Sequence, residues 1–253
     1  MRIEYLYRFP VKGLTAEALE EATVERGGTI PWDRAFALAQ GDSGFDAVNP
    51  VWLPKSNFMC LARNARVAKL AAFFEPRTGT LTLRAPDGIE VAENALRPEG
   101  RAKLGMFLTA YLGDEARGTP HFEYVQGHTF ADGRGKTISL INMASLHDFE
   151  AKVGARRHRR RFRANVWFSG VPAWGERDWV GQEIQMGGAV LKVIRNIPRC
   201  PATEVNPITA ERDADPVAEL QRLYGHKDLG IYAEVVEGGH FAVGDAIEVL
   251  GAT

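Results

Sequence analysis

Short apolar runs broken by glycine and proline constrain the fold of this 253-residue chain more than any other feature. Residues 80–84 alternate apolar and polar side chains and then enter a Pro-Asp-Gly turn, which is typical of a β-hairpin. A second hairpin is predicted over residues 182–194 with its turn at Gly187-Gly188, and residues 231–250 are again β-rich. Many short strands favour closed or nearly closed antiparallel sheets, so we expect a mainly β protein.

Only a few helices are expected. Residues 98–112 begin with a proline and end before Gly113, which predicts one helix. Ser145 is predicted to cap the start of a second helix, which Gly154 ends. The apolar run over residues 67–74 has the length of a strand.

Glycine, proline and aspartate accumulate around residues 113–135, where we place a domain boundary. The expected architecture is two β-barrel-like domains with a few peripheral helices, over residues 1–118 and 119–253.

The composition is that of an ordinary globular protein, with 45% hydrophobic and 25% charged residues and a formal net charge of -1. Binding to nucleic acid or to an anionic membrane needs a net basic surface, so neither partner is expected. Residues 1–10 lack the unbroken apolar stretch of a signal peptide, and no run approaches the ~18 apolar residues of a membrane helix. A cytoplasmic location is expected.

The chain has two cysteines, Cys60 and Cys200, which excludes a disulfide framework and an iron–sulfur cluster held by four cysteines of this chain. Cys200 lies between Pro198 and Pro201, beside Arg199, in a loop that restricts the backbone. Neighbouring positive charge favours the thiolate, which binds metals and attacks electrophiles. The alternative is a small hydrophobic residue that only fills space, and Cys60, in an apolar run, fits that alternative.

Six arginines stand within residues 156–163. Residues 156–160 are interpreted as a solvated helix end, where cations complement the helix dipole. Arg163 precedes Asn165 at the start of an apolar strand, where a planar bidentate donor suits a phosphate or a carboxylate.

Lys12 followed by Gly13 would let a charged head and a bare backbone N–H approach one anion, although a surface lysine in a turn is the alternative. Arg34 stands just before another apolar run. The six histidines show no metal-ligand spacing, and nothing supports a zinc hydrolase, a nucleotide-binding fold or a serine hydrolase.

Together these segments resemble the MOSC family, named after the C-terminal domain of molybdenum cofactor sulfurase, including the β-barrel domain that precedes it in many members. The resemblance rests on residues 7–14 and 33–38 in the first half and on residues 161–166, 174–181, 198–203, 206–213, 229–233 and 243–249 in the second. It covers nearly the whole chain in the family's order.

The resemblance implies a molybdenum-molybdopterin cofactor with Cys200 as the catalytic residue and metal ligand, in keeping with the softness of a thiolate. The cofactor's phosphate and pterin contacts would then fall on Lys12, Gly13, Arg34, Ser145, Arg163, Asn165 and Arg199.

Some positions depart from the family's pattern, although none of them is the metal ligand. Ala164 stands where a proline is usual, Asn206 where an aspartate is common, and Ala210 where a glycine is common. Gly13 replaces a serine of the animal members, and Trp32 replaces a glycine.

The resemblance implies an oxidoreductase that reduces N-hydroxylated or N-oxygenated small molecules. The chain lacks the cysteines of a ferredoxin domain, so a separate electron-donor protein of ferredoxin, flavin or cytochrome type is expected. The alternative is a non-catalytic carrier that delivers the cofactor or its sulfur. Asp213 and His226 are candidate proton donors by residue type alone.

Overall fold

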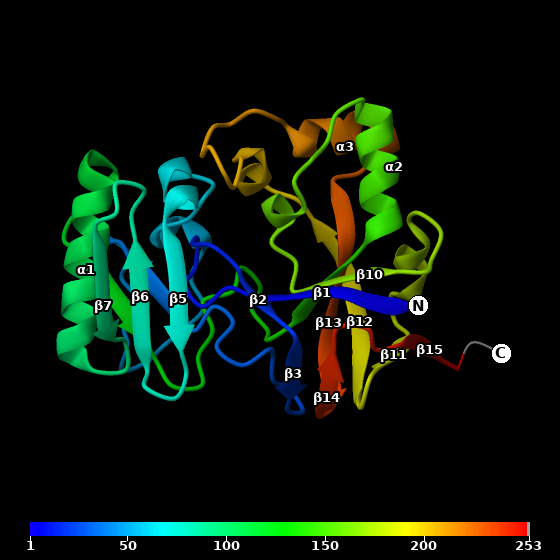
Figure 1. The fold of residues 1–253 in the computed structure, drawn as a ribbon, viewed down its shortest axis with the longest axis horizontal. Coiled ribbons are helices and arrows are strands. Elements are labelled where there is room, and N and C mark those ends of the chain that lie inside the picture. Colours follow the sequence, from blue (N-terminus) through cyan, green and yellow to red (C-terminus); the bar gives the residue numbers. More distant parts are fainter. Residues whose placement is uncertain (252–253) are drawn as a thin grey trace.

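The computed structural model describes residues 1–251, and its largest feature is an eight-stranded curled sheet (Figure 1). The strand order is β15-β11-β12-β13-β9-β10-β1-β2. Neighbouring strands run antiparallel except β9 and β10, which run parallel. The strands are β1 (Arg2–Arg8), β2 (Glu17–Leu19), β9 (Ile138–Asn142), β10 (Val166–Ser169), β11 (Glu183–Met186), β12 (Ala189–Pro198), β13 (Asp228–Glu237) and β15 (Ile247–Leu250).

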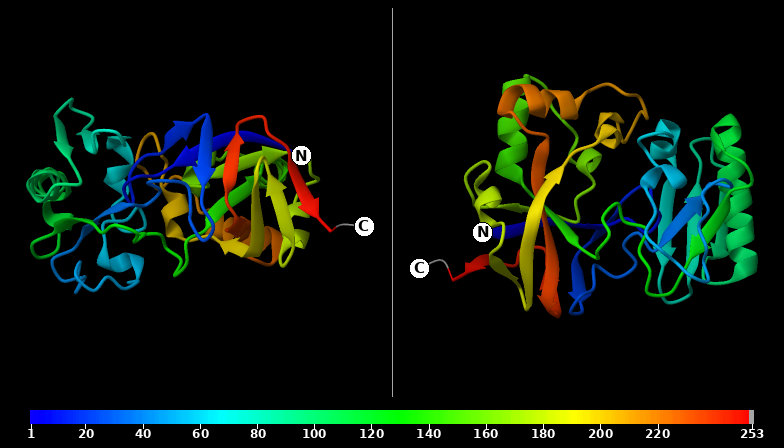
Figure 2. Two further views of the ribbon diagram at one scale, coloured as in Figure 1. Left: turned by 90° about the horizontal axis from the view of Figure 1, so that it is seen from below. Right: turned by 180° about the vertical axis from the view of Figure 1, so that it is seen from behind.

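Burial along these strands explains the sheet. Strand β11 alternates exposed and buried residues, as expected when one face packs on a core and the other meets water. Strand β9 is buried at all five positions because both of its faces are covered: Ile138 and Leu140 pack in the core of the sheet, and helix α2 contacts the strand. The long strands β12 and β13 curve through the centre of this body (Figure 2).

The first strands of the chain belong to this C-terminal body. Ile3 and Leu6 of β1 are buried in the same core as Leu191 and Ile231. Strand β3 (Glu21–Val24) pairs with β14 (Gly239–Ala242), near the other end of the sequence. Strands β1 and β3 therefore lie with the C-terminal half in space, although the prediction placed them in a domain of residues 1–118.

A second body, at the opposite end of the molecule, contains the middle of the first half (Figures 1 and 2). Its core includes Phe36, Phe74, Leu81 and Leu104. It is built from β4 (Phe36–Ala39) paired with β8 (His121–Tyr124), from the three-stranded sheet β5 (Ala71–Glu75), β6 (Thr80–Arg84) and β7 (Glu90–Asn94), and from helix α1 (Pro98–Leu112).

The prediction of a mainly β protein with a few helices is confirmed. Helix α1 has the predicted bounds, whereas α2 (Met143–Val153) begins two residues before Ser145. Its cap is Asn142, whose side chain accepts from the amide of Ala144 at 3.0 Å, so the prediction of Ser145 as the cap is wrong. Helix α3 (Pro216–Tyr224) packs beside α2.

Short 3-10 helices complete the fold, and one of them corrects a second prediction. Residues 67–74 are not one strand, because the chain makes the 3-10 helix η2 before β5 begins. Across residues 1–251, no helix combines the length and the apolar character needed to cross a membrane. The 3-10 helices are η1 (Lys55–Asn57), η2 (Ala65–Lys69), η3 (Gly113–Glu115), η4 (Arg159–Phe162), η5 (Gly175–Trp179) and η6 (Pro201–Glu204).

Candidate functional site

A cavity of about 270 Å³ has walls contributed by both bodies. Seven of the eight site residues predicted from the sequence line it, namely Lys12, Gly13, Arg34, Arg163, Asn165, Arg199 and Cys200. They come from the loops after β1 and before β4, from the chain that enters β10, and from the end of β12.

Cys200 is held where β12 ends and the short helix η6 begins. Its carbonyl oxygen accepts from both the backbone amide of Thr203, at 3.0 Å, and the hydroxyl of Thr203, at 2.9 Å. Cys200 is half-buried and lines the cavity. The sulfur therefore stands on a restrained backbone at the wall of a space large enough for a ligand.

Positive charge dominates the cavity walls. Two carboxylates, Asp33 and Asp132, face seven basic side chains. Burial lowers the pKa of Arg163 to about 9, with the charge of Arg34 adding to the effect, and burial lowers the pKa of Arg199 to about 10. The seven basic residues are Lys12, Arg34, Lys55, Arg161, Arg163, Arg195 and Arg199.

Two of these cations flank one aromatic ring. The guanidinium carbons of Arg34 and Arg163 each lie 4.3 Å from the ring centroid of Phe9. Arg34 Nη2 donates to the carbonyl of Arg163 at 2.9 Å, and Arg163 Nη1 donates to the carbonyl of Leu14 at 2.6 Å. Both arginines have positive φ, 52° and 51°, a strained conformation that persists where the surroundings enforce it.

Lys12 is buried and already has partners. Its Nζ donates to the carbonyl of Phe130 at 2.8 Å and pairs with Asp132. Burial lowers the pKa of Lys12, while Asp132 opposes that shift. The turn that carries Lys12 requires Gly13, which has a φ of 86° and whose missing Cβ would lie 3.2 Å from the carbonyl oxygen of Met59.

Asn165 lines the cavity, but its amide is committed to the scaffold. Its Oδ1 accepts from Ser139 Oγ at 2.7 Å, and its Nδ2 donates to the carbonyl of Tyr7 at 3.2 Å. These bonds join the start of β10 to β9 and β1. Asn165 therefore orients the wall that carries Arg163.

Ser145, the eighth predicted residue, lies away from the cavity. It is buried in α2, where its Oγ lies 2.8 Å from both carboxylate oxygens of Glu176 and accepts from the amide of Trp174 at 2.8 Å. These hydrogen bonds use the hydroxyl of Ser145 to join α2 to η5 and the residue before it. The expected cofactor contact at Ser145 is therefore not supported by the geometry.

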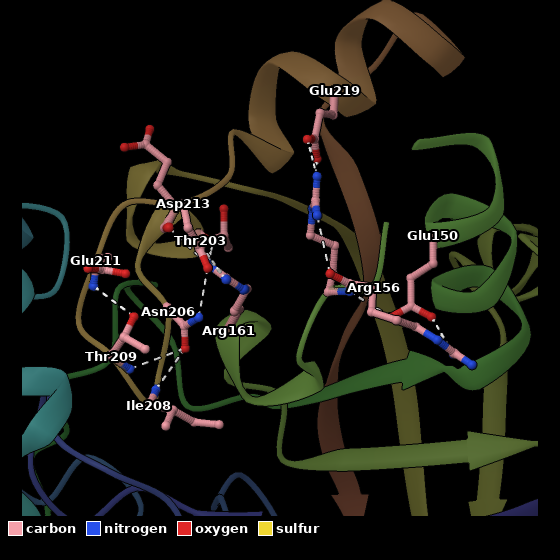
Figure 3. Close-up of polar contacts among 12 residues, drawn as sticks. Glu150, Arg156, Arg161, Thr203, Asn206, Ile208, Thr209, Glu211, Asp213 and Glu219 are labelled. Carbon is pink, nitrogen blue, oxygen red and sulfur yellow. Dashed lines mark hydrogen bonds and ion pairs between the residues drawn. The ribbon is translucent and has the colours of Figure 1, made fainter. Parts of the chain in front are cut away.

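The solvated helix end predicted over residues 156–160 describes only part of the run. Arg156 is exposed and pairs with Glu150 at 2.9 Å (Figure 3). Arg157 is largely buried and pairs with Glu219 of α3, and Arg159 lies 3.8 Å from the ring centroid of Tyr5. Paired arginines therefore join the end of α2 to α3 and β1.

Arg161 is a cavity residue that was not predicted from the sequence. It reaches from η4 toward Thr203 and Asp213 (Figure 3), pairs with Asp213, and donates to the carbonyl of Glu204 at 2.9 Å. Its alternation with Arg163 across Phe162 was an available signal. Against the effect of burial, hydrogen bonds from Asn206 and Arg161 lower the pKa of Asp213, which disfavours Asp213 as a proton donor.

Lys55 and Asp132 also line the cavity and were not predicted from the sequence, because neither stands in a periodic pattern. Lys55 lies 3.8 Å from Asp132. Although burial opposes it, interaction with Cys200 and Asp132 raises the pKa of Lys55, which keeps a positive charge beside the sulfur. Cys60, interpreted as packing, is buried but also lines the cavity. His226 lies elsewhere, between Arg177 and the amide of Asp228.

Two buried donors in the walls lack partners. The Nε–H groups of Arg161 and Arg199 have no hydrogen-bond partner within residues 1–251. An unpartnered buried donor is costly, so a ligand with acceptor oxygens would be stabilised here. The cavity therefore combines a cysteine sulfur, suited to a soft metal, with cations suited to an anionic group.

Models of two domain families match the chain. The MOSC N-terminal beta barrel domain matches residues 1–119, and the MOSC domain matches residues 127–248. Among solved structures, the YUAD protein from Bacillus subtilis aligns over 98% of this chain and 94% of its own, with a TM-score of 0.48 and 17% identity.

Curated relatives match part of the chain. Mitochondrial amidoxime reducing component 2 of Rattus norvegicus is 29% identical over 140 residues, which is 51% of this chain and 41% of that protein. Mitochondrial amidoxime-reducing component 1 of Mus musculus is 30% identical over 124 residues, which is 44% of this chain and 36% of that protein. The matched region spans less than half the length of either relative.

Proposed function

Because this chain belongs to the MOSC family, with a MOSC N-terminal β-barrel domain before its MOSC domain, we propose that it binds a molybdenum-molybdopterin cofactor and reduces N-oxygenated small molecules. The observation that carries the proposal is the cavity in which Cys200 meets basic side chains from both bodies. The names of the rat and mouse relatives direct the choice of substrate class to amidoximes.

The residues present fit such a cofactor. Cys200 offers a half-buried sulfur on a restrained loop, and a thiolate is a ligand that suits a sulfur-rich metal site. The unpartnered Nε–H groups of Arg161 and Arg199 and the buried charge of Arg163 offer donors to a phosphate and to pterin oxygens. Cys200 would hold the metal, and the arginines, with Lys12, would hold the phosphate and the pterin.

When bound, the cofactor supplies two-electron redox chemistry. For an amidoxime the net reaction breaks the N–O bond, consumes two electrons and two protons, and releases an amidine and water. A separate electron-donor protein would provide the electrons.

The chain's own residues would bind and orient the reactants. Lys55 keeps a proton on Nζ and places its charge beside Cys200. Arg34 and Arg163, stacked on Phe9 and joined by a hydrogen bond, form a rigid cationic wall that needs little reorganisation when an anion arrives. Asn165 fixes that wall to β1 and β9.

Turnover of benzamidoxime by purified, molybdenum-loaded protein with an artificial electron donor tests the proposal. We expect formation of benzamidine, one molecule for every two electrons consumed. Fully loaded protein that produces no benzamidine would contradict the reductase function and favour the cofactor carrier.

A further inference from the structure

Arg195 differs from the other basic residues of the cavity. It lies on β12, five residues before Cys200, and is exposed, whereas the other six are buried or half-buried. Each of those six has a hydrogen-bond or ion-pair partner. Across residues 1–251, the guanidinium of Arg195 has neither. Its charge is therefore available to a ligand.

An aromatic ring fixes the position of this guanidinium. Arg195 and Tyr232 are cross-strand partners on β12 and β13, and both line the cavity. The guanidinium carbon lies 4.6 Å from the ring centroid of Tyr232. A guanidinium stacked on a ring keeps its N–H edges free for a planar carboxylate.

The cavity thus carries positive charge at two depths, one buried in its walls and one exposed to solvent. Arg161 and Arg199 are buried in its walls and have unpartnered donors there. Arg195 stands at the exposed side, close to the facing loop, where a Cβ built on Gly133 would lie 3.8 Å from its Nη2. The buried Arg161 and Arg199 suit the cofactor, and the exposed Arg195 remains available to a second anionic group.

We propose that Arg195, stacked on Tyr232, is a specificity-determining residue that selects N-oxygenated substrates carrying a carboxylate on a planar frame. This inference rests on the proposed reductase function. In such a substrate the carboxylate would accept from the guanidinium edge, while the N–O group faces the interior of the cavity.

Comparison of 4-carboxybenzamidoxime with benzamidoxime tests the inference. In the wild type we expect kcat/KM to be about ten-fold higher for the carboxylated compound, as one charge-assisted hydrogen-bonded pair provides. The ratio should fall to about one in Arg195→Gln. Lys192→Gln, which removes an exposed cation from the same strand outside the cavity, should keep the wild-type ratio. An equal preference in the wild type, or a preference that survives in Arg195→Gln, would overturn the inference.

Two further measurements separate this inference from the proposed function. Calorimetric titration of molybdenum-loaded protein with 4-carboxybenzamidoxime should show about ten-fold weaker binding to Arg195→Gln, whether or not turnover occurs. If benzamidoxime is not reduced at all while this difference in binding remains, the reductase function fails and the subsite stands. Loss of molybdenum from Arg195→Gln would assign Arg195 to the cofactor and overturn the inference.

Discussion

Arg163 keeps a buried positive charge in the cavity wall at a cost in free energy that a bound anion would reduce. Its guanidinium is stacked on Phe9 and bonded to a backbone carbonyl, yet burial and the charge of Arg34 lower its pKa to about 9. Such a shift means that the charged form is held at a free-energy cost in the absence of a counter-ion. A bound anion would remove part of that cost.

Inorganic phosphate should therefore stabilise the cofactor-free protein through Arg163. At a phosphate concentration about one hundred times the Kd of the wild type, bound phosphate should raise the free energy of unfolding of the wild type by about 2.7 kcal/mol. In Arg163→Gln the gain should fall below half of this value, measured by urea unfolding with and without phosphate. Arg77→Gln, at an exposed turn, is the matched control and should keep the full gain. Equal gains in both variants would show that Arg163 does not bind the phosphate.

Individual site residues were predictable where a local pattern carried them. Cys200 between two prolines and Arg163 at the start of a strand both stand in such patterns, and both line the cavity. Asp132 and Lys55 approach the cavity only because two loops meet in space. Ser145 was misassigned because the chemistry of a helix cap is shared by its neighbour Asn142, and the partner that engages Ser145 is 31 residues away.

At the scale of elements, predictions succeeded where the signals of start and stop agreed. Helix α1 follows its proline and ends at Gly113, and the hairpin β11–β12 turns at the predicted glycines. Residues 67–74 failed because a 3-10 helix and a strand are both apolar here, so the pattern does not show where one ends.

The contact between α2 and η5 gives a pH-dependent prediction. Burial raises the pKa of Glu176, while hydrogen bonds from Ser145 and Asn142 oppose the shift. The pKa of Glu176 is therefore higher in the folded than in the unfolded protein. Below both pKa values the carboxyl is protonated in both states and its burial costs no stability. As pH rises through the folded pKa, the free energy of unfolding falls, because the buried carboxyl must lose its proton. Glu176→Gln removes this titration, so its stability relative to the wild type should increase from pH 4.5 to pH 7. Parallel curves of Tm against pH for the two proteins would contradict this assignment.

At the scale of the whole molecule, long-range pairing decides the architecture. The pairing of β1 with β10 brings residues near position 2 beside residues near position 169, and no local pattern predicts such a contact. That pairing also places Lys12, just beyond β1, opposite the loop of Cys200. The cavity is therefore a product of topology as much as of its motifs.

Arg212 joins the two walls of this cavity. Its Nη1 donates to the carbonyl of Pro201 at 3.1 Å, and its Nη2 donates to the carbonyl of Ala62 at 2.8 Å. The residue after Cys200 and a residue after Cys60 are thus held by one guanidinium.

Arg212→Ala should loosen both loops without unfolding either body. We expect faster hydrogen exchange of amides in residues 60–64 and 200–205, measured by mass spectrometry, while strand β9 keeps its protection. Arg222→Ala, at an exposed position of α3, serves as the control. Unchanged exchange in both loops would mean that Arg212 does not join the walls in solution.

In the proposed function, the sulfur of Cys200 binds the metal of a molybdenum cofactor. Metal analysis of the wild type, Cys200→Ser and Cys60→Ser, each purified from a molybdate-fed host that makes the cofactor, tests it most directly. We expect near-stoichiometric molybdenum in the wild type and in Cys60→Ser, and severe loss in Cys200→Ser with the fold retained. Molybdenum that is absent from the wild type, or that remains undiminished in Cys200→Ser, would contradict it.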